Sequence, residues 1–80
     1  MPTPASRLHA LVTGASRGIG RAIAQQLAAR GCRVAVHFQK NRAAAETALR
    51  QLAGTGHALF AADLARAGDV SRLWGEVTAA

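Results

Sequence analysis

The sequence predicts an α/β fold in which three parallel strands alternate with three helices. Short apolar runs of strand length recur along the chain, and the segments between them repeat their apolar residues at helical spacing. A glycine-rich segment joins the first apolar run to the first helical segment. The resulting order of elements is β-α-β-α-β-α.

The three expected strands cover residues 8–13, 33–38 and 57–61. Each is a mainly apolar run, without strict alternation of apolar and polar residues. Strands of this kind are buried on both faces, as in a parallel sheet that carries helices on each side. The runs therefore favour a parallel sheet over an antiparallel one.

The first expected helix follows the glycine-rich segment. Ile19, Ile23 and Leu27 recur every four residues and form an apolar stripe, and alanines fill positions between them. Gly31 stands where the helix is expected to end. The pattern predicts an amphipathic helix over these residues.

Two further helices are expected after the second and third strands. Asn41 is the expected N-cap of the second helix, which ends before Gly54. Its apolar positions are Ala45, Leu49 and Leu52. Asp69 is the expected N-cap of the third helix, and Trp74 is expected to pack within the apolar stripe of that helix. This stripe consists of Val70, Leu73, Trp74 and Val77.

This order of elements predicts a sheet with strand order 3-2-1, because right-handed crossovers join parallel strands. The first two helices then cover one face, and the third helix lies on the other face. The first strand would be an exposed apolar edge unless a fourth strand paired with it. We therefore expect residues 1–7 to be a short lead and residues 8–80 to be an incomplete domain, the first part of a larger one.

The charge balance points to an anionic partner or to an incomplete chain. The 80 residues include 10 Lys and Arg but only 4 Asp and Glu, which gives a formal net charge of +6. Nucleic acid or a phosphorylated cofactor would suit this charge, and so would acids that lie beyond residue 80. The basic residues are scattered singly and lack interleaved aromatic residues, which disfavours nucleic acid.

Other classes of protein are disfavoured by composition. Cys32 is the only cysteine, which excludes an internal disulfide framework, and we expect it to be a small buried residue. No apolar segment is long enough to span a bilayer. His9, His37 and His57 are too scattered to assemble a metal site, so they are expected to be structural. We therefore expect a soluble intracellular protein.

Residues 13–20, Thr-Gly-Ala-Ser-Arg-Gly-Ile-Gly, carry the pattern that points to a ligand. Gly14 allows a tight turn out of the strand, and Gly18 lets the backbone approach a pyrophosphate. Gly20 allows the helix to pack closely on the strand. The N–H groups at the helix start would then face the phosphates. The alternative is a tight glycine-rich turn that binds nothing.

This segment resembles the T-G-x-x-x-G-x-G cofactor motif of the short-chain dehydrogenase/reductase family, in a form frequent in 3-oxoacyl-[acyl-carrier-protein] reductases. Asp63 and Leu64, after the third strand, resemble the family's adenine-side motif. The resemblance covers nearly the whole chain. It implies the β-α-β-α-β-α N-terminal part of a Rossmann doubly wound parallel sheet. It also implies a nicotinamide cofactor and the reduction of a keto group to a hydroxyl.

The expected cofactor is NADP(H). NAD-preferring members of the family carry an acid at the end of the second strand, where this chain has Phe38 and then Gln39. Arg17 could pair with a 2′-phosphate, whereas Lys40 and Arg42 are more simply solvated charges at a helix start. Asp63 would accept a hydrogen bond from adenine or, alternatively, form a turn. The expected cofactor-binding residues are Gly14, Ser16, Arg17, Gly18, Ile19, Gly20, Phe38, Gln39, Asp63 and Leu64.

The family's catalytic residues are a Ser and a Tyr-x-x-x-Lys pair, and none is assigned here, because the chain has no Tyr. The expected partners are NADPH and a keto substrate such as an acyl-carrier-protein thioester. The expected whole enzyme is a homo-oligomer in the cytoplasm or, alternatively, in a mitochondrial or plastid matrix. Two other functions stay open. One is a truncated non-catalytic product that binds a nucleotide or a partner, and the other is a nucleic-acid-binding fragment.

Overall fold

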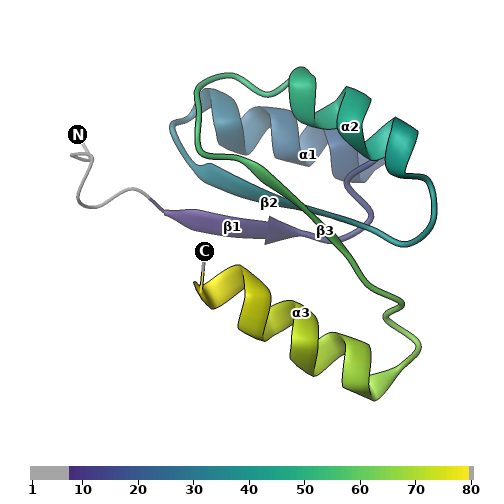
Figure 1. The fold of residues 1–80 in the computed structure, drawn as a ribbon. Coiled ribbons are helices and arrows are strands. Elements are labelled where there is room, and N and C mark those ends of the chain that lie inside the picture. The colour runs from purple at the N-terminus through teal and green to yellow at the C-terminus, as the bar shows by residue number, and fades with distance from the viewer. Residues whose placement is uncertain (1–7, 80) are drawn as a thin grey trace.

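The computed structural model describes residues 8–79, which form a three-stranded sheet with helices on both faces (Figure 1). The elements are β1 (His9–Val12), α1 (Gly18–Ala29), β2 (Arg33–Phe38), α2 (Arg42–Arg50), β3 (Ala58–Ala61) and α3 (Ala67–Ala79). In Figure 1, α1 and α2 lie above the sheet and α3 lies below it. The predicted order of elements is confirmed. The expected lead, residues 1–7, lies outside the described residues.

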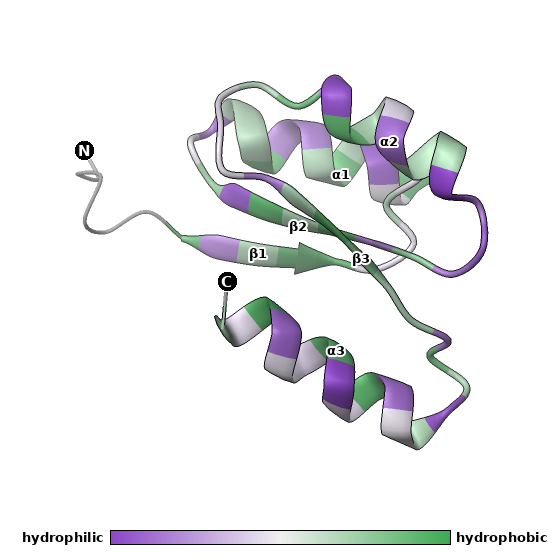
Figure 2. Ribbon diagram, viewed as in Figure 1, coloured by the Kyte–Doolittle hydropathy of each residue, from purple (hydrophilic) through white to green (hydrophobic). Residues whose placement is uncertain are grey.

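The central strand of the sheet is β2, which pairs in parallel with β1 on one side and β3 on the other. In this register Val36 is the partner of both Val12 and Leu59, so the three strands end close to one another. Val34 and Val36 are fully buried on the face that α1 and α2 cover, and Ala35 is buried on the face that α3 covers. Figure 2 shows mainly hydrophobic residues along the strands and a mixture of hydrophobic and polar residues along the helices. The parallel sheet with β1 at its edge is as predicted.

Small side chains build the core between α1 and the sheet. Ala24 and Ala28 are buried there, and Leu27 packs against them from the side. The predicted helix is confirmed, but its predicted apolar stripe is wrong for Ile19 and Ile23, which are 81% and 47% exposed. Alanine allows the helix backbone to come closer to the sheet than isoleucine would, and close packing favours that face.

The second helix, α2, is capped as predicted by Asn41. Its Oδ1 accepts a hydrogen bond from the N–H of Ala44 at 3.0 Å, which satisfies a donor that the helix start would leave unpaired. Ala45 and Ala48 are its buried residues, and Leu52 closes the core just beyond the helix. These contacts fix the short loop between β2 and α2.

The third helix, α3, packs on the opposite face through a smaller core. Leu73 and Val77 are buried there with Ala35 of β2 and Ala62. The predicted stripe is wrong for its other two members, since Val70 and Trp74 are 43% and 62% exposed. Because α3 contacts the sheet mainly at β3, only a stripe of one residue per turn is covered.

The start of α3 also differs from the prediction. The helix begins at Ala67, so Asp69 lies inside its first turn and is not the N-cap. The Asp69 carboxylate instead accepts a hydrogen bond from the backbone N–H of Asp63 at 2.9 Å. Local capping preference favoured a helix start at Asp69, but the loop after β3 provides a donor from outside the helix.

Two histidines join neighbouring segments of the sheet, as expected of structural residues. His57 Nδ1 accepts a hydrogen bond from the N–H of Val34 at 3.0 Å. His9 Nδ1 lies 3.0 Å from the guanidinium of Arg33, which can only donate. Burial and then the charge of Arg33 lower the pKa of His9 from its ordinary value. Cys32 is buried, as predicted.

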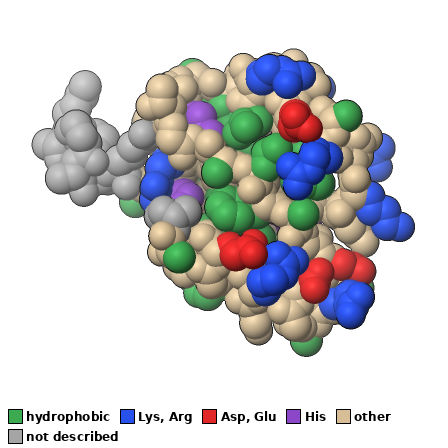
Figure 3. All heavy atoms as spheres, in the orientation of Figure 1, with side chains coloured by type: hydrophobic (Ala, Val, Ile, Leu, Met, Phe, Trp, Pro, Cys, Tyr) green, Lys and Arg blue, Asp and Glu red, His purple; other side chains and the backbone are tan. Residues whose placement is uncertain are grey.

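The surface carries scattered charge. Figure 3 shows basic side chains spread over this face of the molecule, with no single patch where they gather. Within residues 8–79, none of the helices combines the length and the apolar character needed to cross a membrane.

Candidate functional site

Three loops meet at the carboxyl edge of the sheet. Residues 13–17 follow β1, residues 39–41 follow β2, and residues 62–66 follow β3. In open parallel sheets, ligands bind in the crevice just outside the carboxyl ends of the strands. The residues predicted to bind a cofactor therefore lie in or beside the loops where the fold places a ligand.

The glycine loop, residues 13–20, makes the predicted turn. Gly14 and Gly18 have φ values of +62° and +64°, which glycine adopts without steric cost. A Cβ atom on Gly20 would lie 2.9 Å from the carbonyl carbon of Gly14, so this close approach requires glycine. The predicted close packing at Gly20 is thus made to the loop itself. A Cβ atom on Gly18 would meet no atom within 4 Å, so the space in front of it is open.

The start of α1 offers unpaired backbone donors beside this loop. Arg17 is the N-cap residue, and its side chain makes no capping hydrogen bond. The helical bonds begin with the N–H of Arg21, which donates to the carbonyl of Arg17 at 3.3 Å. The N–H groups that precede Arg21 have no acceptor within the helix. The first turn also holds no acidic side chain, so the positive end of the helix dipole is not neutralised there.

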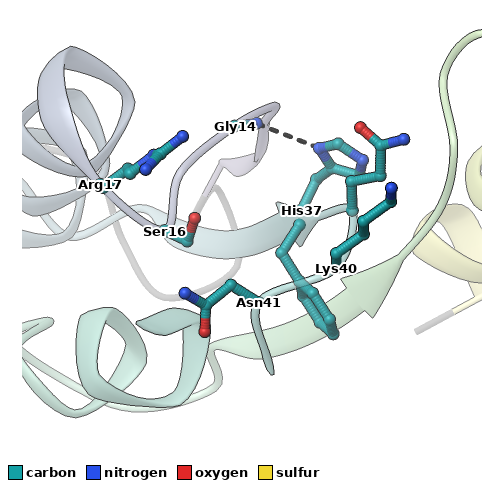
Figure 4. Close-up of a pocket in the computed structure, with 8 residues that line it drawn as sticks. Gly14, Ser16, Arg17, His37, Lys40 and Asn41 are labelled. Atoms are coloured by element: carbon teal, nitrogen blue, oxygen red, sulfur yellow. Dashed lines mark hydrogen bonds between the residues drawn. The ribbon is translucent and has the colours of Figure 1, made fainter. Parts of the chain in front are cut away.

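An open cleft of about 450 Å³ lies between the glycine loop and the residues that follow β2 (Figure 4). This volume is in the range of small-molecule sites. No acidic side chain lines the cleft. The lining residues are Gly14, Ser16, Arg17, His37, Phe38, Gln39, Lys40 and Asn41.

Positive charge lies on both sides of the cleft. Arg17 stands at the start of α1 and Lys40 just after β2, and both side chains are exposed. Phe38, at the position where an acid would bind a ribose hydroxyl, is buried, and its ring centroid lies 5.0 Å from the guanidinium carbon of Arg42. Cations without a carboxylate make the cleft suited to an anionic ligand.

The site includes one residue that the sequence interpretation treated as purely structural. His37 lines the cleft, and its ring accepts a hydrogen bond from the N–H of Gly14 (Figure 4). Its position as a polar residue inside a buried apolar strand was the available signal. Across residues 8–79, the structure brings together no three His, Cys, Asp or Glu side chains that could hold a metal ion.

The other predicted cofactor residues do not line this cleft. Gly18, Ile19 and Gly20 form the first turn of α1, beside it. Asp63 and Leu64 follow β3 at the same edge of the sheet, and the Leu64 side chain is 43% exposed. The structure thus gathers five predicted residues in the cleft, which are Gly14, Ser16, Arg17, Phe38 and Gln39.

The loop after β3 is held by two carboxylates. Asp63 Oδ1 accepts a hydrogen bond from the N–H of Ala65 at 3.0 Å, which is the turn geometry considered as the alternative to adenine binding. The N–H of Asp63 holds the pKa of Asp69 below its ordinary value. The positive charges of Arg72 and Arg66 act in the same direction, and partial burial opposes them.

The sequence of this chain is similar to those of known reductases. The sequence model described as short chain dehydrogenase matches residues 8–80. The 3-oxoacyl-[acyl-carrier-protein] reductase FabG of Staphylococcus aureus is 46% identical over 70 residues, which cover 85% of this chain and 28% of that protein. The hydroxynaphthalene reductase-like protein Arp2 of Metarhizium guizhouense is 44% identical over 69 residues, which cover 84% of this chain and 26% of that protein.

Solved structures agree with these sequence matches. The landomycin C-6 ketoreductase LanV, with bound NADP and rabelomycin, superposes with a TM-score of 0.76 at 45% identity. The superposition covers 85% of this chain and 29% of LanV. The chain therefore spans little more than a quarter of the length of these relatives.

Proposed function

The chain belongs to the short-chain dehydrogenase family, and from this membership we propose that it is the NADPH-binding part of a ketoreductase. Its three parallel strands and three helices are the N-terminal portion of a Rossmann sheet. The observation that carries the proposal is a cleft between the glycine loop and the end of β2 that presents cations and no carboxylate. The proposed reaction reduces a keto group to a hydroxyl.

The proposed pyrophosphate site is the start of α1. The backbone N–H groups of Gly18, Ile19 and Gly20 precede the first helical hydrogen bond and are free of intrahelical acceptors. The space in front of Gly18 is open, so a phosphate could approach the backbone there. The N–H groups and the open space would both suit the pyrophosphate of a dinucleotide.

The proposed preference for NADPH rests on charge. Arg17, aided by Lys40, would pair with the 2′-phosphate, and no acid stands in the cleft to repel it. Phe38 and Gln39 would line the adenosine part of the site. Asp63, in the loop after β3 at the carboxyl edge of the sheet, would accept a hydrogen bond from the adenine amino group. Leu64 would lie beside it.

When bound, the cofactor would supply a hydride to the carbonyl carbon of the substrate. The residues of this chain would bind and orient the nucleotide. The chain has no Tyr, so we assign no proton donor to it. We propose that residues 8–80 are part of a larger domain whose remaining residues complete the reaction.

The proposed substrate is a ketone, with a 3-oxoacyl thioester of acyl carrier protein as the favoured example. The FabG relative supports a thioester, whereas LanV is named as a landomycin C-6 ketoreductase and the Arp2 relative as a hydroxynaphthalene reductase-like protein. We further propose a cytoplasmic enzyme that acts as a homo-oligomer, as expected from the family resemblance.

The proposal is tested on the protein that contains this chain. The purified protein is titrated with NADPH and with NADH, and then supplied with a 3-oxoacyl thioester and with aromatic ketones while NADPH oxidation is followed. We expect tighter binding of NADPH than of NADH, and turnover of at least one ketone. Binding without turnover of any ketone would support a non-catalytic nucleotide-binding product. Failure to bind either nucleotide would refute the proposed function.

A further inference from the structure

His37 makes a hydrogen-bonded bridge between two loops of the site. The residue is the last but one of β2, beside the cleft, and is 4% exposed. Its Nδ1 atom lies 3.0 Å from the backbone nitrogen of Gly14, in the glycine loop. Its Nε2 atom lies 2.9 Å from the carbonyl oxygen of Ala62, which directly precedes Asp63. One side chain thus contacts the loops that follow β1 and β3.

The two partners fix the protonation of the His37 ring. The Gly14 N–H is a donor, so Nδ1 must be the unprotonated nitrogen that accepts the bond. The Ala62 carbonyl can only accept, so Nε2 must carry the hydrogen. The ring is therefore held as the neutral tautomer with hydrogen on Nε2, and it cannot turn over without losing both bonds.

The bridge lies where the backbone ladders of the sheet end. The N–H of Ala15 donates to the His37 carbonyl at 3.1 Å, and the N–H of Ala62 donates to the Phe38 carbonyl at 3.1 Å. These two bonds join the end of β2 to the segments that follow β1 and β3. The N–H of Gly14 points to the imidazole instead, so the ring determines how the Gly14 peptide is turned as the chain leaves β1.

The turn at Gly14 affects the rest of the glycine loop. Gly14 has a positive φ, and its carbonyl group faces the Cα of Gly20 in the first turn of α1. The bonded N–H belongs to the Thr13–Gly14 peptide and this carbonyl to the next one, Gly14–Ala15, and the two peptides share the Gly14 Cα. A rotation of the first peptide changes the φ of Gly14 and thereby moves this carbonyl against the helix start. The orientation of Gly14 is thus linked by direct contact to the backbone donors of α1.

We propose that His37 is a positioning residue, which sets the orientation of the Gly14 peptide and thereby the conformation of the glycine loop. The consequence for NADPH binding rests on the proposed function, but the effect on the loop does not. The bond to Gly14 is the important one for the loop, and the bond to Ala62 holds the ring in place.

Two conservative variants separate the two bonds. In His37→Asn, the side-chain oxygen occupies the position of Nδ1 and can still accept from Gly14. In His37→Gln, the side-chain nitrogen reaches the position of Nε2 and can still donate to Ala62. His37→Leu removes both bonds. The Asn and Gln variants each lose one of the two bonds. A difference between them therefore reports which bond was lost, and not merely that a bond was lost.

The first measurement is hydrogen exchange of the Gly14 amide at single-residue resolution, in the protein that contains this chain. We expect protection in the wild type and in His37→Asn, and faster exchange, by about tenfold, in His37→Gln and His37→Leu. Thermal unfolding of the same variants shows whether each is folded. Equal exchange of the Gly14 amide in the Asn and Gln variants would overturn the proposal.

The second measurement is the dissociation constant for NADPH. We expect His37→Asn to bind within about threefold of wild type and His37→Gln to bind about tenfold more weakly. Equal affinity of these two variants would overturn the role of His37 in binding. If the wild type itself fails to bind NADPH, the proposed function is wrong, and the exchange of the Gly14 amide alone then decides the role of His37.

Discussion

Arg17 is the single side chain with the largest expected effect on cofactor preference. It is exposed at the N-cap of α1, lines the cleft and makes no capping bond that would occupy it. A charge-assisted hydrogen bond contributes about 1.5–3 kcal/mol, or roughly one to two powers of ten in affinity. We expect Arg17→Ala to weaken NADPH binding by about 10- to 100-fold and to leave NADH binding nearly unchanged, as measured by titration.

A matched control for Arg17 is available at the other end of the same helix. Arg30 is the C-cap residue of α1, and Arg30→Ala removes the same charge far from the cleft. This variant should bind both nucleotides as the wild type does. Equal weakening of NADPH and NADH by Arg17→Ala would mean that Arg17 maintains the loop and does not contact a 2′-phosphate.

Gly20 is the glycine whose replacement should cost the most stability. A Cβ atom there would lie 2.9 Å from the Gly14 carbonyl carbon, a backbone atom that cannot move aside without distorting the loop. We expect Gly20→Ala to lower the free energy of unfolding by about 1–3 kcal/mol, as for other overpacked sites. Denaturant unfolding measures this difference.

Gly75 provides the contrast with Gly20. It lies within α3, and a Cβ atom there would meet nothing within 4 Å. Gly75→Ala should therefore raise the free energy of unfolding, by up to about 1 kcal/mol, because alanine favours helix. If both alanine variants were equally stable, the close approach of α1 to the glycine loop would not be a constraint on the fold.

At the scale of secondary structure elements, the carboxylate of Asp69 helps to hold the junction between β3 and α3. Asp69, in the first turn of α3, accepts the N–H of Asp63, and this bond lowers its pKa. A carboxyl group with a lower pKa in the folded chain stabilises the fold above its ordinary value of 3.8. That stabilisation is lost as the pH falls through the lowered pKa.

The variant Asp69→Asn tests this junction, because asparagine retains an oxygen acceptor but carries no charge. We expect the variant to be less stable than the wild type near neutral pH. The two free energies of unfolding should converge as the pH falls from the ordinary carboxyl pKa of 3.8 through the lowered pKa of Asp69, where the wild-type carboxyl becomes protonated in the folded chain. The measurement is denaturant unfolding at a series of pH values. A difference that stays constant with pH would contradict the prediction.

In α1 and α2 the buried face consists of alanine, whereas α3 buries Leu73 and Val77. The core residues of α1 are Ala24 and Ala28, and those of α2 are Ala45 and Ala48. Larger apolar residues on α1, such as Ile19 and Ile23, remain exposed. A stripe of large apolar residues thus predicts that a helix exists but does not predict which of its faces is buried. The buried face is the one that can approach the sheet most closely.

At the scale of the whole molecule, the described sheet has two uncovered edges, because β1 and β3 each pair only with β2. The strand β1 has a neighbour on one side only, and Leu8, Ile19 and Ile23 are exposed. Apolar strand edges are normally paired or covered. This agrees with the proposal that residues 8–80 belong to a larger domain.

The mass of the natural protein tests that proposal. The chain has a mass of 8.3 kDa and matches only 26–28% of the length of the curated relatives. We expect the intact protein, isolated from its native source, to have about three times this mass by mass spectrometry. A native species of 8.3 kDa would contradict the proposal and would favour the non-catalytic product.

The sequence by itself determined the order of the elements, the parallel sheet and the glycine loop. Each of these follows from local signals, namely apolar runs, helical spacing, a capping side chain at Asn41 and glycines where the backbone needs positive φ. The motif of residues 13–20 also pointed to the family, because it resembles that family's T-G-x-x-x-G-x-G cofactor motif.

Only the tertiary structure decided which side chains meet. The alanine faces of the helices, the bond from Asp63 to Asp69 and the bridge made by His37 all join segments that are distant or differently oriented in the sequence. His37 lies 23 residues from Gly14 and 25 from Ala62. Their contact depends on the pairing of three strand ends. Periodicity indicates which residues share a face of one element, but the register between elements decides what that face touches.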